Sequence, residues 1–376
     1  MRLVIAILNV RHPRRAMRPF AVAAAIAGAV LFAGSAPGVT ASAQQAAAPS
    51  AQPAAVGLIN WIHTTADAEK SFPFYRDVLG IELERSPLLG PAPANAPPER
   101  IRPVPNTQPD QLLWDLTNTQ GARFRNVFMR APNALYGLEL SEFLDIPRET
   151  RQANAWDPGA SVLNVEVRDL NDVLAKLATA GAPIVTLGNA PVDTPAGRAV
   201  LVRDPDGYLI QVTQASPAKI ASARSAGQVV ATTIGITVSN TTKSLAFYRG
   251  LLGFDVRGTR TATAAELRLH GLSEGRLTQT RTAIAGTEIE VVFSEFTLTA
   301  GTTPAPAPFR WRIQDIGAPQ FQLEVRGLDT LIDQTKAAGY QFLSVGARPI
   351  QRAFGRFVFA IDPDGVLVEY VERARR

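Results

Sequence analysis

Residues 361–370, which read IDPDGVLVEY, decide the fold because they encode a tight turn followed by a strand. In Asp362-Pro363-Asp364-Gly365, proline presets φ and glycine accepts a positive φ, and the apolar run that follows favours a strand. The same phrase occurs at residues 204–207, before the run YLIQV. The chain is therefore expected to contain two copies of one hairpin. The fourth residue after the glycine is Glu369 in one copy and Gln211 in the other.

A second motif is also duplicated. Residues 67–80 read DAEKSFPFYRDVLG, and residues 240–253 read NTTKSLAFYRGLLG. Asp67 and Asn240 are good N-caps, apolar residues follow at helical spacing, and Gly80 and Gly253 suit helix C-termini. Each copy is therefore predicted to be a short amphipathic helix. Apolar, strand-like runs precede both helices, at residues 56–64 and 229–238.

Two further units begin with strand-like runs at residues 162–167 and 321–325. Their helices are expected to start near Asn171 and Asp329. Each of the four units then reads as a strand, a helix and about three strands, which predicts an α+β protein built of βαβββ modules. We expect two domains, at residues 56–214 and 229–376, joined by a linker at 215–228. A proline-rich insertion at 86–110 is predicted to be a surface loop, or alternatively a lid over a cavity.

The first 43 residues have the layout of a secretory signal peptide. Five arginines precede an apolar run at residues 20–33, and Ala41-Ser42-Ala43 resembles a cleavage site. This predicts a secreted or periplasmic protein cleaved near Ala43, with a disordered linker at 44–55. A retained N-terminal anchor and a true start at Met17 are the alternatives. The apolar run is shorter than the roughly 20 residues that a membrane span needs, so no stable membrane insertion is expected.

Composition narrows the classes of partner. The net charge of +5 disappears on cleavage, because residues 1–43 carry five arginines and no acidic residue, leaving 38 − 5 = 33 basic against 33 acidic residues. A neutral mature chain argues against nucleic-acid binding. Cysteine is absent, which excludes disulfides and thiolate chemistry. A small molecule is the expected partner, and the sequence leaves the oligomeric state open.

Four such modules, with FYRDVLG-type helices and DPDG hairpins, resemble the vicinal oxygen chelate (VOC) superfamily, which includes glyoxalase I, bleomycin resistance proteins and type I extradiol dioxygenases. The resemblance covers nearly all of residues 56–372. It implies that paired modules curl their sheets around a concave site. It also implies a divalent metal there, held by His, Glu or Gln from the first and last strands of the modules.

The metal-ligand positions that the resemblance implies correspond to one residue on the first strand and one on the last strand of each unit. The first-strand position, seven residues before the helix cap, selects Asn60, Val162, Thr233 and Gln320, and the last-strand position selects Glu139, Gln211, Val292 and Glu369. The ligand-binding candidates are therefore Asn60, Glu139 and Gln211 in the first domain, and Thr233, Gln320 and Glu369 in the second domain.

None of these positions holds a histidine. His63 lies an odd number of residues from Asn60, so in a strand it faces the opposite side, towards the helices, and is expected to be a packed or edge histidine. His270, near a turn, is expected at the surface. A site of two histidines and one carboxylate is therefore not available within either domain. We predict no stoichiometric transition metal, and Glu369 as the ligand if a weak divalent site exists.

These observations favour an exported tandem protein that binds a small molecule in a sheet-lined cavity without a tightly held metal. The alternative is a glyoxalase-like lyase or isomerase, or a dioxygenase relative, that uses a weakly bound divalent ion. Strand alternation puts Leu367 and Glu369 on one face of the strand, and the resemblance implies that this face is the concave interior. Thr233, Gln320 and Glu369 are accordingly expected to converge in one cavity of the second domain.

Overall fold

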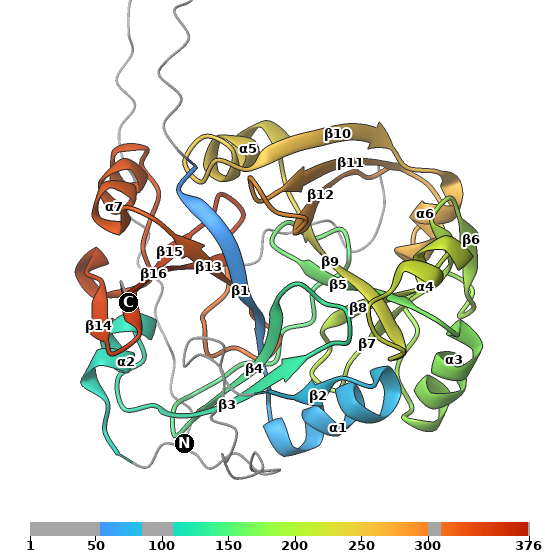
Figure 1. Cartoon of the computed structure of the whole chain (residues 1–376), viewed down its shortest axis with the longest axis horizontal. Helices are drawn as coiled ribbons and strands as arrows, with labels where there is room; N and C mark the ends of the chain where they lie inside the picture. The colour runs from blue at the N-terminus through green and yellow to red at the C-terminus, as the bar shows by residue number, and fades with distance from the viewer. Residues whose placement is uncertain (1–52, 85–107, 300–309, 375–376) are drawn as a thin grey trace, which may run out of the picture. The chain divides into compact units, whose positions relative to one another are not determined.

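The computed structural model describes residues 53–84, 108–299 and 310–374 (Figure 1). The predicted presequence, all but the last residues of the predicted linker at 44–55, and most of the insertion at 86–110 lie outside these ranges. Within them, no helix has the length and apolar character needed to cross a bilayer.

The first and second units each contain a strand, a helix and three further strands, as predicted, and a short extra helix interrupts the first. Asp67 caps the first helix by accepting a hydrogen bond from the Glu69 N–H at 3.0 Å, and Gly80 ends it at φ 68°. The elements are β1 Ala55–Thr64, α1 Ala68–Leu79, β2 Glu82–Leu83, α2 Gln111–Thr117, β3 Arg123–Arg130 and β4 Gly137–Leu144, then β5 Ser161–Val167, α3 Leu170–Thr179, β6 Val192–Thr194, β7 Gly197–Arg203 and β8 Leu209–Gln214.

The third and fourth units repeat this order. Asn240 caps α5 by accepting from the Lys243 N–H at 3.0 Å. The predicted linker at 215–228 contains a short helix, α4 Pro217–Ser222. The elements are β9 Val229–Thr237, α5 Thr241–Tyr248, β10 Asp255–Thr261, α6 Ala264–Leu269, β11 Arg276–Ala283 and β12 Glu290–Thr297, then β13 Pro319–Val325, α7 Leu328–Ala337, the 3-10 helix η2 Val345–Ala347, β14 Ile350–Arg352, β15 Gly355–Ile361 and β16 Leu367–Arg373.

The strands form two eight-stranded sheets, and each sheet combines units from both halves of the chain (Figure 1). The first sheet joins units one and four in the order β14-β15-β16-β13-β1-β4-β3-β2, and the second joins units two and three in the order β10-β11-β12-β9-β5-β8-β7-β6. We call them sheet A and sheet C. The central contacts are antiparallel, with Trp61 opposite Phe321 in sheet A and Leu163 opposite Ile234 in sheet C.

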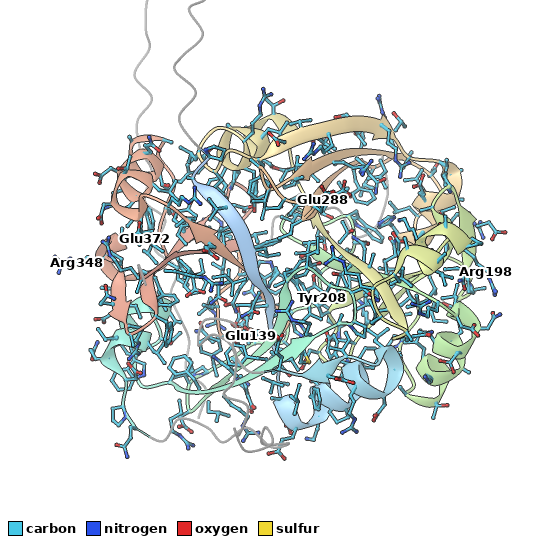
Figure 2. All side chains as sticks on the ribbon, viewed as in Figure 1. Glu139, Arg198, Tyr208, Glu288, Arg348 and Glu372 are labelled. Carbon is cyan, nitrogen blue, oxygen red and sulfur yellow. The ribbon has the colours of Figure 1, made fainter. Side chains whose placement is uncertain are left out.

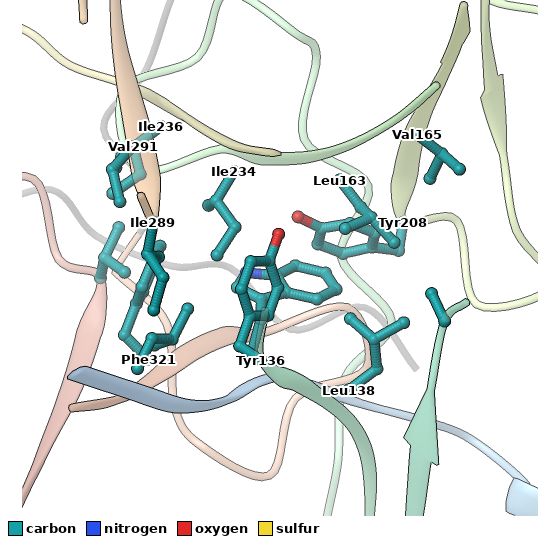
Figure 3. Packing of buried hydrophobic residues seen from close by; sticks show 14 of the residues in the cluster. Tyr136, Leu138, Leu163, Val165, Tyr208, Ile234, Ile236, Ile289, Val291 and Phe321 are labelled. Atoms are coloured by element: carbon teal, nitrogen blue, oxygen red, sulfur yellow. The ribbon is translucent and has the colours of Figure 1, made fainter. Parts of the chain in front are cut away.

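The main hydrophobic core contains side chains of both sheets (Figure 3). Tyr136, Leu138 and Phe321 come from the sheet A side, and they face Leu163 and Ile234 from sheet C. The helices α1, α3 and α7 add apolar side chains to the same core. The opposite face of each sheet is therefore left to line a cavity of its own.

Candidate functional site

A cavity of about 180 Å³ lies against sheet A. Its volume is close to that of an apolar cavity of about 150 Å³ that takes up benzene in another protein, so it has room for a single-ring molecule. Glu139 of β4 and Glu369 of β16 also line it, and both side chains are buried. Figure 2 labels Glu139 inside the ribbon, whereas Arg198 and Arg348 project from its periphery. Much of the wall is aromatic, being made by Phe124, Phe128, Phe143, Phe354, Phe357 and Phe359.

The side-chain amides of Asn60 and Gln322 connect the two carboxyl groups by hydrogen bonds across the sheet. Asn60 Nδ2 donates to Glu139 Oε2 at 3.2 Å and to Gln322 Oε1 at 2.9 Å. Gln322 Nε2 in turn donates to Glu369 Oε2 at 2.7 Å. Gly137 is required beside Asn60, because a Cβ there would lie 2.1 Å from Asn60 Oδ1. Side chains from opposite ends of the sequence thus form one hydrogen-bonded row.

Burial in this cavity raises the pKa of Glu139 to about 8, and the charge of Glu369 adds to that increase. Burial also raises the pKa of Glu369 to about 7, and the hydrogen bond from Gln322 opposes this rise. Near neutral pH the pair therefore holds at least part of a proton. Such a pair can donate one hydrogen bond, accept others and exchange a proton with a bound molecule.

Four of the six predicted site residues meet in sheet A: Asn60, Glu139, Gln320 and Glu369. Gln320 lines the cavity and donates from Nε2 to Thr64 Oγ1 at 3.1 Å. The predicted convergence of Thr233 with Gln320 and Glu369 is wrong, because Thr233 belongs to β9 of sheet C. The prediction paired units within each half of the chain, whereas the strands pair across the halves.

Sequence reasoning missed Gln322, which bridges Asn60 and Glu369. Its signal was present, because residues two apart on a strand share a face and Gln320 was already a candidate. It also missed Arg352, the one basic residue among the described side chains that line this cavity. Arg352 Nη2 donates to both carboxylate oxygens of Asp110 at 2.6 Å. Asp110 caps α2, so this ion pair holds the helix at the cavity wall.

Known proteins share this architecture. The profile of the Glyoxalase/Bleomycin resistance protein/Dioxygenase superfamily matches residues 58–212 and 229–370. The chain belongs to this superfamily. Its predicted fold class is thereby confirmed, and the matched ranges fall within the predicted halves at 56–214 and 229–376.

Solved structures show the same fold at low sequence identity. Glyoxalase I from Zea mays is 15% identical, with a TM-score of 0.51, and the match covers 84% of this chain and 92% of that one. A candidate dioxygenase from Bacillus subtilis subsp. subtilis str. 168 is 12% identical, with a TM-score of 0.50, and the match covers 86% and 87%. No curated protein sequence shows significant similarity to the chain.

The second superfamily cavity, against sheet C, differs in chemistry. Its volume is about 350 Å³, and Gln211 and Thr233 line it beside Val162 and Val292. No carboxylate stands at these four superfamily positions. The acids on its wall are paired with bases, as in the contact of 2.5 Å between Arg260 Nη2 and Glu266 Oε1.

Both described histidines are buried. His270 was expected at the surface, and that prediction is wrong because its side chain lines the sheet C cavity and its Nδ1 lies 2.7 Å from the Glu266 carbonyl oxygen. Burial lowers the pKa of His270. His63 is buried, in agreement with the prediction of a packed histidine, and its ring stacks on Tyr208 with ring centroids 4.8 Å apart.

Proposed function

We propose that the chain binds a small single-ring molecule in the sheet A cavity, with Glu139 and Glu369 as its polar anchors. The observation that carries this proposal is the combination of an aromatic wall with two buried carboxyl groups at its floor. The aromatic side chains bury the ring, and each carboxyl accepts or donates a hydrogen bond.

The charges define the preferred class of ligand. The carboxyl pair disfavours an anion, and the positive charge of Arg352 is already neutralised by Asp110. A ring that bears a hydroxyl, amine or amidinium group can donate to Glu139 or Glu369, whereas a ring with a carboxylate would meet two acids. We therefore propose a neutral or cationic aromatic ligand with at least one hydrogen-bond donor.

The test uses four single-ring probes: toluene, phenol, benzamidine and benzoate. Saturation-transfer NMR should show binding of phenol and benzamidine, weaker binding of toluene and none of benzoate. Glu369→Gln should weaken benzamidine binding at least tenfold, because a carboxylate that can pair with the amidinium is lost. Gln211→Leu is the matched control at the equivalent position of sheet C and should leave all four results unchanged. Preferred binding of benzoate, or no effect of Glu369→Gln, would rule out this assignment.

A second candidate is a metal-assisted lyase or isomerase, favoured by the carboxyl pair at the superfamily's ligand positions. Proteins of this superfamily commonly bind a divalent metal. Here Glu139, Glu369, Asn60 and Gln322 offer only oxygens, which suit a hard ion such as Mn²⁺. Both amides currently direct N–H groups at the carboxyls and would have to turn over. A bound ion would polarise a substrate carbonyl. Mn²⁺ binding by the wild type that is lost in Glu139→Gln would support this candidate. A wild type without Mn²⁺ bound at Glu139 would exclude it.

We also propose export of the mature protein with cleavage near Ala43, supported by the basic and apolar pattern of residues 1–43. N-terminal sequencing of the protein from its native host tests this directly. An intact Met1 or Met17 terminus on protein from the cytoplasm would contradict it.

A further inference from the structure

A buried cluster lies on the face of β1 opposite the sheet A cavity. His63 is on β1, and Asp204 and Asp206 are in the turn between β7 and β8. All three side chains are at most 3% exposed. His63 Nε2 lies 3.1 Å from Asp204 Oδ2 and 3.6 Å from Asp206 Oδ2. The cluster thus joins the first unit of the chain to the second.

The spacing of these atoms matches the coordination shell of a metal ion. One ligand atom from each residue lies within 4.8 Å of the other two. Two donors at about 2.1 Å from one ion are roughly 3.0 Å apart at a right angle and about 3.4 Å apart at a tetrahedral angle. The two measured separations from His63 Nε2 lie close to this range. One nitrogen and two carboxylate oxygens can therefore reach a single ion.

The imidazole of His63 is the independent observation that points to a ligand. Its side chain is buried, and neither ring nitrogen makes a hydrogen bond of normal geometry, although Nε2 lies 3.1 Å from Asp204 Oδ2. A buried polar side chain without hydrogen bonds is costly, so such groups call for a specific explanation. Coordination through Nε2 would supply the missing interaction.

The carboxylates are already oriented as metal ligands usually are. Tyr75 donates its hydroxyl to Asp204 Oδ2 at 2.7 Å, and Ser71 donates to Asp206 Oδ2 at 2.7 Å. Hydrogen bonds of this kind fix ligating carboxylates, and each oxygen keeps a second lone pair for an ion.

The second DPDG turn shows that this scaffold does not need a histidine. Tyr248 donates to Asp362 Oδ2 at 2.9 Å, and Ser244 donates to Asp364 Oδ2 at 3.1 Å, as in the first turn. The residue that corresponds to His63 is the buried Ile236. The same turn therefore forms with an apolar neighbour, so His63 is an addition to the scaffold.

We propose that His63, Asp204 and Asp206 bind a divalent transition metal that fastens the first unit to the second. Imidazole with carboxylates suits ions such as Zn²⁺ and Mn²⁺. The site is separate from the sheet A cavity, whose described lining includes none of the three residues, and we assign it a structural role. The proposal replaces the expectation from sequence that no transition metal is held. That expectation placed His63 on the face opposite Asn60 and did not bring Asp204 and Asp206 to it.

The experiment measures metal content in the full chain. Protein is produced in medium supplemented with Zn²⁺ or Mn²⁺ and purified without chelator. Its metal content is then measured by inductively coupled plasma mass spectrometry. The wild type should hold about one equivalent. His63→Ile, which copies Ile236, should lose it, whereas the Glu139→Gln/Glu369→Gln double variant should keep it. The double variant separates this site from any ion in the sheet A cavity.

A wild type without bound metal, or a His63→Ile variant with as much metal as the wild type, would overturn the proposal. If His63→Ile does not fold by circular dichroism, Asp206→Asn serves instead, since its amide oxygen can still accept the Ala66 N–H bond that Asp206 Oδ1 accepts at 2.8 Å. Co²⁺ substitution gives a second readout. The visible absorption of Co²⁺ should differ from that of the aqueous ion in the wild type and be lost in the variant. An aqueous-like spectrum in the wild type would contradict the proposal.

Discussion

Single residues next to the two equivalent DPDG turns determine the environment of the buried aspartate that begins each turn. In the first turn, Asp204 has His63 at 3.1 Å and the charge of Arg203 nearby. In the second turn, the apolar residues Ile236 and Ile361 occupy the positions that correspond to His63 and Arg203. Burial raises the pKa of Asp362 to about 7, and the charge of Asp364 contributes. The first aspartate of the motif thus has basic side chains beside it in one copy, whereas in the other copy burial among apolar neighbours favours its protonated form.

This difference predicts a pH-dependent stability. The pKa of Asp362 is higher in the folded chain than its ordinary value of 3.8, so the folded state binds the extra proton. The stabilisation is complete below about pH 4 and is lost as the pH rises through about 7. We expect Asp362→Asn, which keeps a neutral acceptor for the Val366 and Asp364 N–H bonds, to flatten the fall in the free energy of unfolding between about pH 5 and 8.

Urea denaturation at several pH values measures this effect. Asp333→Asn, at an exposed position on α7, is the control and should retain the wild-type slope. An equal pH dependence in Asp362→Asn and in the wild type would show that Asp362 is ionised in the folded state.

At the level of elements, local signals predicted well where a cap or turn determines the structure. The caps Asp67 and Asn240, and the turns at Gly207 and Gly365 with φ of 83° and 90°, form as the sequence indicates. α2 was not predicted, because it directly follows a proline-rich stretch, and its counterpart in the third unit, α6, is also a short helix that was not predicted. The position of α2 depends on contacts with distant residues, such as the 2.7 Å bond from Ser344 Oγ to the Leu116 carbonyl.

Two variants test how α2 is held at the cavity wall. Asp110→Ala removes both the cap on the Leu113 N–H and the ion pair with Arg352, while Arg352→Gln removes only the ion pair. Loss of the cap costs about 1 kcal/mol, which corresponds to roughly fivefold faster exchange of the amide hydrogens of α2. Hydrogen exchange should therefore increase more in Asp110→Ala than in Arg352→Gln. Equal exchange in the two variants would assign the stabilisation to the ion pair alone.

At the level of the whole molecule, the sequence predicts the modules but not their pairing. The first strands of the four units are similar apolar runs. Backbone hydrogen bonds between strands do not depend on the side chains, so from sequence β1 could pair with the first strand of any other unit. The structure pairs β1 with β13 and β5 with β9. This is why all six predicted site residues were correctly placed on strands, while Thr233 was assigned to the wrong cavity.

The central claim is that units one and four enclose one site, so that Glu139 and Glu369 share a cavity. The most direct test is ¹³C NMR titration of the Glu139 carboxyl, with its signal assigned by its loss in Glu139→Gln. We predict a pKa of about 8 in the wild type and a lower value in Glu369→Gln, because the charge of Glu369 contributes to the increase. Gln211→Leu should leave that pKa unchanged. A pKa near 4.5, or one that does not respond to Glu369→Gln, would contradict the account.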